Sequence, residues 1–288
     1  MPAVAVWEHG PIHPARAEFI RASTRLTAPG LVPEVRLHLA DEPIRLWELT
    51  EQALGRTDLA PPFWAFAWAG GQALARYVLD HPGTVRGRRV LDVATGSGLV
   101  AIAAAKAGAA AVTAADIDPL AISAVALNAE ANDVTVATWD GDVLGATWDG
   151  DVLGATWDGD VLGGDPDEAG TAGGSRPAGP AEVGPPEVGL AEVGLAEVVL
   201  AADVFYEREL AGRVMRFLER AHARRATVLI GDLGRTYLPR SGLRELADYD
   251  VPVPRALEDA DVKRTAVWQP VDRRSRNLPG RRPRNGSQ

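Results

Sequence analysis

The chain contains no cysteine among its 288 residues. Disulfide bonds, thiol nucleophiles and thiolate metal sites are therefore excluded. The five histidines are scattered and show no spacing typical of metal ligands. No apolar run is long enough to cross a bilayer, and the N-terminus lacks the basic-then-apolar order of a signal peptide. We therefore expect a cytoplasmic protein without a metal or a membrane partner.

Positive charge is also scarce, with 30 Lys and Arg residues against 39 Asp and Glu and a net charge of −9. Such a surface repels phosphate backbones, which disfavours nucleic acid as a partner. The exception is the arginine-rich segment 273–288, which we interpret as a basic disordered tail. The overall composition, 46% hydrophobic and 24% charged, is that of a globular chain with one large core.

Short apolar runs alternate with helical patterns over residues 88–138. Asp118 and Pro119 stand at the cap and first position of one such helix, a strong start signal. This alternation predicts an α/β fold, a Rossmann-like doubly wound parallel sheet with helices on both faces. Further along we expect a strand, a helix, a strand, a short helix and a last strand, over residues 197–203, 208–224, 226–232, 241–249 and 263–270.

The domain organisation is interrupted by repeats. The unit ATWDGDVLG occurs three times in tandem over residues 137–163, and AEVG-like units follow over 181–200. Units of nine and five residues do not stack into a repeat architecture, and the DGD triplets lack the remaining ligands of a calcium loop. We interpret 146–196 as a low-complexity insertion in one domain spanning 61–272, preceded by an N-terminal extension, 1–60, of short helices and an irregular arm.

A loop rich in small residues, VLDVATGSG (90–98), stands between a predicted strand and a predicted helix. Small residues there let a ligand approach backbone amides at a helix N-terminus. Gly96, Gly98 and Ala101 also fit a dinucleotide fingerprint. Asp92 separates the two interpretations, because a carboxylate before the loop repels a pyrophosphate but attracts the ammonium of S-adenosylmethionine. We therefore predict S-adenosylmethionine as the cofactor.

Further carboxylates follow the next two predicted strands. Asp116 ends the second strand and is placed to accept hydrogen bonds from both ribose hydroxyls, whereas Asp118 is better explained as a helix cap. Asp142 follows the third strand and is a candidate for the adenine amino group, with a turn or cap as the competing interpretation. The repeats place equivalent residues at Asp151 and Asp160.

Other polar and aromatic residues are candidates for the same ligands. Trp64 and Trp68 are placed to cover the cofactor, although ordinary packing explains both equally well, and Gln72 is placed to bond the cofactor carboxylate. Asp232 and Arg235, which follow a later strand, either line a substrate cleft or form a structural ion pair.

Several segments together resemble one family. They are FIRASTRLTAPGLVPEVRLHLADE, PPFWAFAWAGGQALARYVLDHP, RRVLDVATGSG, AADIDP, LAADVFYERELA, VLIGDLGR and TAVWQP. The chain resembles the electron transfer flavoprotein beta subunit lysine methyltransferases over roughly residues 19–145 and 197–269. This resemblance implies a class I, seven-stranded methyltransferase with an antiparallel last strand. Ala94 departs from it, because the usual cofactor loop has glycine there, and so does the 146–196 insertion.

The resemblance marks Asp203-Val204-Phe205-Tyr206 as the site of the target lysine. Methyl transfer needs a neutral amine held in line with the donor, so the protein must position, desolvate and deprotonate it. Asp203 is suited to orient the amine, and Phe205 and Tyr206 are suited to form an apolar collar that lowers its pKa. Core packing at a helix start is the competing interpretation for both aromatic residues.

We therefore expect a class I S-adenosylmethionine-dependent methyltransferase whose partner is a protein that presents a lysine. The same machinery also suits a ribosomal protein or a small amine. A third hypothesis is a protein that binds the donor without turnover because the insertion disrupts the adenine side, although the intact DVFY motif argues against it.

Overall fold

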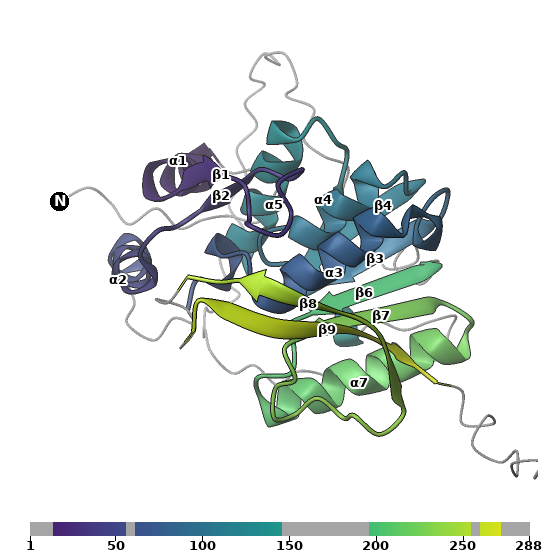
Figure 1. The fold of residues 1–288 in the computed structure, drawn as a ribbon. Helices are drawn as coiled ribbons and strands as arrows, with labels where there is room; N and C mark the ends of the chain where they lie inside the picture. The colour runs from purple at the N-terminus through teal and green to yellow at the C-terminus, as the bar shows by residue number, and fades with distance from the viewer. Residues whose placement is uncertain (1–13, 56–60, 146–195, 255–259, 272–288) are drawn as a thin grey trace, which may run out of the picture.

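The computed structural model describes residues 14–55, 61–145, 196–254 and 260–271 (Figure 1). The predicted tail 273–288, and the predicted insertion up to residue 195, lie outside the described residues. Within the described part of the chain, no helix is long and apolar enough to span a bilayer.

A seven-stranded sheet forms the centre of the molecule, with the order β5-β4-β3-β6-β7-β9-β8. Strands β3 to β7 run parallel, and β9 is antiparallel to both of its neighbours. The predicted mainly parallel sheet with an antiparallel last strand is therefore confirmed. The strands span Arg89–Val93 (β3), Ala111–Asp116 (β4), Ala137–Asp140 (β5), Val198–Ala202 (β6), Thr227–Asp232 (β7), Leu243–Pro252 (β8) and Val262–Pro270 (β9).

Helices cover both faces of this sheet, as the doubly wound fold requires (Figure 1). Three pack on one face, and α7 packs on the other. One apolar core joins Leu74, Ala101 and Val125 to the sheet on the first face, and a second core holds Phe217 under α7. The helices are α3 (Ala69–Asp80), α4 (Leu99–Lys106), α5 (Pro119–Ala131) and α7 (Arg208–Ala223).

The strand order reverses between β3 and β6, the two central strands. The chain proceeds outward from β3 through β4 to β5, and then returns to the other side of β3 for β6 and β7. Open parallel sheets bind ligands beyond the carboxyl ends of their strands at such a switch point. The loops that follow β3 and β6 are therefore the expected site.

Local signals of the sequence predicted the helix starts well. The Asp118 side chain accepts a hydrogen bond from the Leu120 backbone N–H at 2.8 Å, and Pro119 is the first residue of α5. Helix α3 begins at Ala69, directly after Trp68 at its cap position.

The predicted short helix over 241–249 is wrong, because this segment belongs to strand β8, which pairs along nearly all of β9. The register shifts between Glu245 and Ala247, which marks a bulge or irregularity in the pairing. An extra residue in one strand breaks the alternation of side chains. It leaves Leu243, Leu246 and Ala247 at a spacing that imitates a helix.

The N-terminal extension is partly as expected. Short helices α1 (Pro14–Ser23) and α2 (Pro43–Leu54) are present, and between them lies an unpredicted two-stranded sheet of β1 (Arg25–Thr27) and β2 (Leu37–Leu39). Single-turn 3-10 helices follow at η1 (Phe63–Ala65), η2 (Pro82–Thr84) and η3 (Val143–Gly145).

Asn128 of α5 connects this extension to the loop after β3. Its Oδ1 accepts the His38 backbone N–H at 2.7 Å, and its Nδ2 donates to the Ser97 carbonyl oxygen at 2.8 Å. Because Asn128 is fully buried, these bonds fix the extension against the loop.

Candidate functional site

The loop after β3 makes a tight turn with three residues at positive φ: Ala94 (52°), Gly96 (54°) and Gly98 (79°). Glycine adopts this conformation without strain, whereas alanine does so only at a cost. Ala94 therefore adopts the turn conformation at a cost in backbone strain. Gly98 also permits close packing, because a Cβ there would lie 3.1 Å from Val125 Cγ2.

Asp92 lies beneath this loop and is 2% exposed. Its Oδ2 accepts hydrogen bonds from Thr95 Oγ1 at 2.6 Å and from the Ala101 N–H at 3.1 Å, so the carboxylate holds the loop against the start of α4. Burial, together with the charge of Asp116, raises the pKa of Asp92 to about 7 despite these two bonds.

Asp116 closes the loop from the neighbouring strand. Its Oδ2 accepts the Gly96 N–H at 2.9 Å, and its Oδ1 accepts the Asp118 N–H at 3.0 Å. Burial raises the pKa of this carboxyl as well. Next to it, Ile117 is 71% exposed, an apolar side chain at the carboxyl edge of the sheet that the sequence analysis overlooked. A lone apolar residue between Asp116 and Asp118 was the available signal.

These residues fit S-adenosylmethionine. In the described part of the chain neither Asp92 nor Asp116 forms an ion pair, and both have raised pKa values. A ligand with a sulfonium and an ammonium supplies the missing positive charge, whereas a pyrophosphate adds to the repulsion. Asp116 retains acceptor capacity for ribose hydroxyls, and exposed Ile117 offers an apolar surface for a flat base.

The remaining donor-side candidates are placed differently. Asp142 forms an ion pair with Arg213 of α7 and accepts the Leu144 N–H at 3.0 Å, so the structure shows the turn interpretation and does not bring its side chain to Asp116. Asp151 and Asp160 lie outside the described residues.

Trp64, Trp68 and Gln72 serve packing in this structure. Trp64 is 1% exposed within an apolar core, and Trp68 Nε1 donates to the Phe63 carbonyl oxygen at 2.9 Å. The Gln72 amide is bonded to three backbone groups, those of Leu31, Ala67 and Pro252. Gln72 thereby ties the N-terminal arm and β8 to α3, and its amide is not directed at the loop.

Asp203 follows β6 with φ at 57°, a left-handed conformation that is uncommon for aspartate. Its Oδ2 accepts the Gly71 N–H at 2.8 Å, so the carboxylate caps the N-terminus of α3. The next helix along the chain, α7, begins at Arg208 with Glu207 at its cap position, so Asp203 does not cap it. Burial raises the pKa of Asp203 to about 6, against the opposing effect of Arg235.

A pair of glycines lets α3 reach Asp203. A Cβ on Gly70 would lie 2.3 Å from the Gly231 carbonyl oxygen and 2.7 Å from Asp203 Oδ2. A Cβ on Gly231 would lie 2.2 Å from the Gly70 carbonyl oxygen. The sequence pattern did not indicate Gly70 and Gly231 as site residues. The available signal was that Gly70 and Gly71 are adjacent glycines at a helix start.

The two aromatic residues of the DVFY motif have different surroundings. Phe205 is fully buried in the core under α7, as the packing interpretation predicted. Tyr206 is 47% exposed, and its ring centroid lies 5.4 Å from that of Phe63. Only Tyr206 is therefore placed to meet a substrate.

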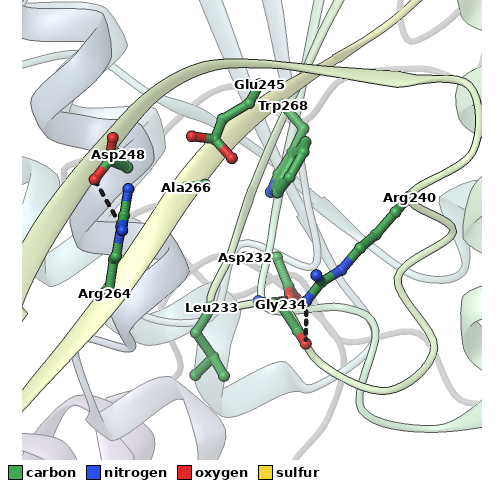
Figure 2. A pocket seen from close by; sticks show the side chains of 9 residues that line it. All are labelled: Asp232, Leu233, Gly234, Arg240, Glu245, Asp248, Arg264, Ala266 and Trp268. Atoms are coloured by element: carbon green, nitrogen blue, oxygen red, sulfur yellow. Dashed lines mark hydrogen bonds and ion pairs between the residues drawn. The ribbon is translucent and has the colours of Figure 1, made fainter.

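A cavity of about 220 Å³ opens where β7 meets β9 and β8, with Asp232 among its lining residues (Figure 2). Asp232 is fully buried, and its Oδ1 accepts the N–H groups of Gly234 and Arg235, each at 2.7 Å. Its Oδ2 accepts no hydrogen bond from the described residues. The cavity is smaller than typical ligand pockets of roughly 300–1,000 Å³, so it suits a side chain better than a cofactor. Its lining is completed by Leu233, Gly234, Arg240, Glu245, Asp248, Arg264, Ala266 and Trp268.

Arg235 joins the carboxylates at the ends of β6 and β7. Its Nη2 lies 3.2 Å from Asp203 Oδ1, and its Nε lies 4.0 Å from Asp232 Oδ2. Of the two interpretations from sequence, the ion pair therefore describes Arg235, whereas Asp232 does line a cavity.

Comparisons with known proteins relate the chain to two kinds of methyltransferase. The family model of ribosomal protein L11 methyltransferase (PrmA) matches residues 73–147, which hold Asp92 and Asp116 but end before Asp203. Several curated relatives carry the name "Electron transfer flavoprotein beta subunit lysine methyltransferase". The Xenopus laevis protein is 31% identical over 87% of this chain and 85% of its own length. The Mus musculus protein is 29% identical over 89% and 85%, and the Homo sapiens protein is 43% identical over 42% and 45%.

The match therefore extends through both halves of the sheet, and the donor is S-adenosylmethionine. The chain belongs to the electron transfer flavoprotein beta subunit lysine methyltransferase family, as a class I S-adenosylmethionine-dependent protein-lysine methyltransferase.

Proposed function

We propose that the chain N-methylates a lysine of an electron transfer flavoprotein beta subunit, in the cytoplasm. The observation that carries this proposal is the match to the Xenopus laevis protein, which covers 85% of that relative. A ribosomal protein is the weaker candidate, because the L11 methyltransferase family model covers only residues 73–147.

We infer the roles of the residues from their positions. Asp203 orients the target amine at the carboxyl end of β6, and Tyr206 with Phe63 forms an aromatic wall beside it. An aromatic face attracts a cation and excludes water from a neutral amine. Phe205 lies buried in the core beside this site and contributes through packing.

Asp92 and Asp116 bind the donor. Asp92 holds the loop in place and supplies negative charge beneath it, and Asp116 faces the ribose hydroxyls. The loop residues Ala94, Gly96 and Gly98 let the ligand approach the backbone. Asp142, Trp64, Trp68 and Gln72 contribute through the fold, because their polar or aromatic groups contact other parts of the protein.

When bound, the donor supplies an electrophilic methyl carbon on a sulfonium. The lysine ammonium first releases one proton to solvent. The neutral nitrogen then forms a bond to the methyl carbon, while the carbon–sulfur bond breaks and its electron pair stays on sulfur. The product is a methylated ammonium. The protein contributes position, desolvation and control of the proton.

The experiment is incubation of the full chain with isotopically labelled donor and purified electron transfer flavoprotein beta subunit. Mass spectrometry of the digested substrate locates any labelled lysine. We expect label on one or a few lysines, and a strong loss with the Asp203→Asn variant. Labelling of ribosomal protein L11 in a parallel reaction, with none on the flavoprotein subunit, would overturn the proposed substrate.

A further inference from the structure

Arg235 is the cation that the protein itself places in the proposed lysine site. Its Nη2 lies 3.2 Å from Asp203 Oδ1, and its side chain is 21% exposed. Asp232 also holds Arg235 in place, because the Arg235 backbone N–H donates to Asp232 Oδ1 at 2.7 Å and the Arg235 Nε lies 4.0 Å from Asp232 Oδ2.

The charged groups around Asp203 come from several elements. The N-terminus of α3 presents the Gly71 N–H, β7 ends in Asp232, and Arg235 follows. Burial and the charges of Glu207 and Asp116 raise the pKa of Tyr206, and the charge of Arg235 opposes them. The charge of Arg240 acts on Asp232, and both residues line the cavity (Figure 2). Among the described residues, Arg235 is thus the cation that forms an ion pair with Asp203, and its charge acts on both Asp203 and Tyr206.

A carboxylate alone is poorly suited to this reaction. A free lysine has a pKa of about 10.4, so only about one amine in a few thousand is neutral at pH 7. A neighbouring carboxylate stabilises the ammonium and lowers that fraction further, whereas a neighbouring cation raises it. A site that binds the amine through Asp203 therefore needs a second, opposing charge.

We propose that Arg235 is a positioning residue that favours the neutral form of the target amine and the ionised form of Asp203. This inference rests on the proposed lysine site at Asp203. The guanidinium holds Oδ1 of Asp203 and opposes an ammonium at the same carboxylate. The amine thus enters a site where the carboxylate orients it and the guanidinium disfavours its proton.

The sign of the expected pH dependence is the same for both effects. Removing Arg235 raises the pKa of Asp203, because an opposite charge that favours ionisation is lost. It also raises the pKa of the bound amine, because a like charge is lost. Each change moves the onset of activity to higher pH.

The first test is the pH profile of kcat/KM with electron transfer flavoprotein beta subunit as the substrate. Arg235→Gln should shift the acidic limb upward by about one pH unit, which is about tenfold in rate at a fixed low pH. Arg235→Lys should restore part of the shift. The matched control is Arg244→Gln on β8, where an exposed arginine bonds Gln269 and faces no site residue. A uniform loss with an unmoved limb, or a gain at all pH values, would overturn the proposal.

The second test needs no substrate. Carboxyl ¹³C resonances of the aspartates in the full chain are titrated by NMR, and Asp203→Asn identifies the Asp203 signal. We expect the Asp203 midpoint to move to higher pH in Arg235→Gln and to stay unmoved in Arg244→Gln. An unchanged midpoint contradicts the role of Arg235. Failure of the wild-type chain to methylate the flavoprotein subunit contradicts the substrate alone, and this titration still decides the inference.

Discussion

The two halves of the sheet carry carboxylates at the same edge but balance their charge differently. On the donor side, Asp92 and Asp116 lie at the ends of β3 and β4 and form no ion pair within the described residues. On the acceptor side, Asp203 follows β6 and Asp232 is the last residue of β7. Arg235 contacts both carboxylates.

This difference matches what each side must bind. S-adenosylmethionine carries fixed positive charge, so buried carboxylates without a protein cation gain from its arrival. A lysine reacts only as a neutral amine, so the acceptor side provides its own cation. We infer that placement of the positive charge, in the ligand on one side and in the protein on the other, separates binding of the donor from activation of the amine.

The largest effect is expected on the acceptor side. Replacing Asp203 with Asn keeps the shape and removes the charge that orients the amine. Turnover should fall about a hundredfold or more, since each 1.36 kcal/mol of barrier is about tenfold in rate. Donor affinity should stay near the wild-type value. The melting temperature should change little, because Asn caps the α3 amides nearly as well.

Turnover, donor affinity and melting temperature must be measured together on the same Asp203→Asn preparation. Near wild-type turnover would remove Asp203 from the active site and leave it only as the cap of α3. A collapse of the melting temperature would show that the lost activity reflects the fold.

A smaller effect is expected on the donor side. Asp92→Asn should weaken donor binding by about tenfold or more, which is about 1.4 kcal/mol. Turnover at saturating donor should persist, because Asp203 and Arg235 are untouched. The matched control is Asp133→Asn, an exposed residue in the turn before β5. Isothermal titration measures both variants, and equal affinity for Asp92→Asn and wild type would contradict the donor site.

Much of this arrangement could be predicted from the sequence, because it depends on local signals. Asp118 and Pro119 are a helix-start signal that depends only on neighbouring residues. The place of Asp92 directly before the glycine-containing loop can likewise be recognised from the adjacent residues alone. The bulged strand β8 could not be predicted, because pairing with β9 decides it. Gly70 and Gly231 approach each other although they are far apart in the chain. For the same reason, the hydrogen bond from Gly71 to the Asp203 carboxylate could not be predicted from the sequence.

The smallest effect compares two of the non-glycine residues at positive φ, Ala94 on the donor side and Asp203 on the acceptor side. At Asp203 the left-handed conformation places a carboxylate that bonds Gly71 and Arg235, whereas at Ala94 the side chain is a methyl group that forms no polar contact. Ala94→Gly should therefore stabilise the fold by about 1 kcal/mol, since relief of strain exceeds the entropic cost of glycine. Urea unfolding measures this change. A loss of stability would show that Ala94 is not strained.

The central claim is that the positive charge of the bound donor stabilises the ionised form of the donor-side carboxylates. Proton release on donor binding tests this claim most directly. The pKa of Asp92 is raised to about 7, so at pH 6.5 most of this carboxyl is protonated before the donor binds. Donor binding favours the ionised form, so affinity should fall as the pH drops through 7, and about half of a proton or more should be released at pH 6.5. Calorimetric titration in buffers of different ionisation enthalpy counts these protons. The account predicts more proton release from the wild type than from Asp92→Asn, in which Asp116 is the remaining donor-side carboxyl with a raised pKa. Equal release by both proteins, or none by either, would contradict it.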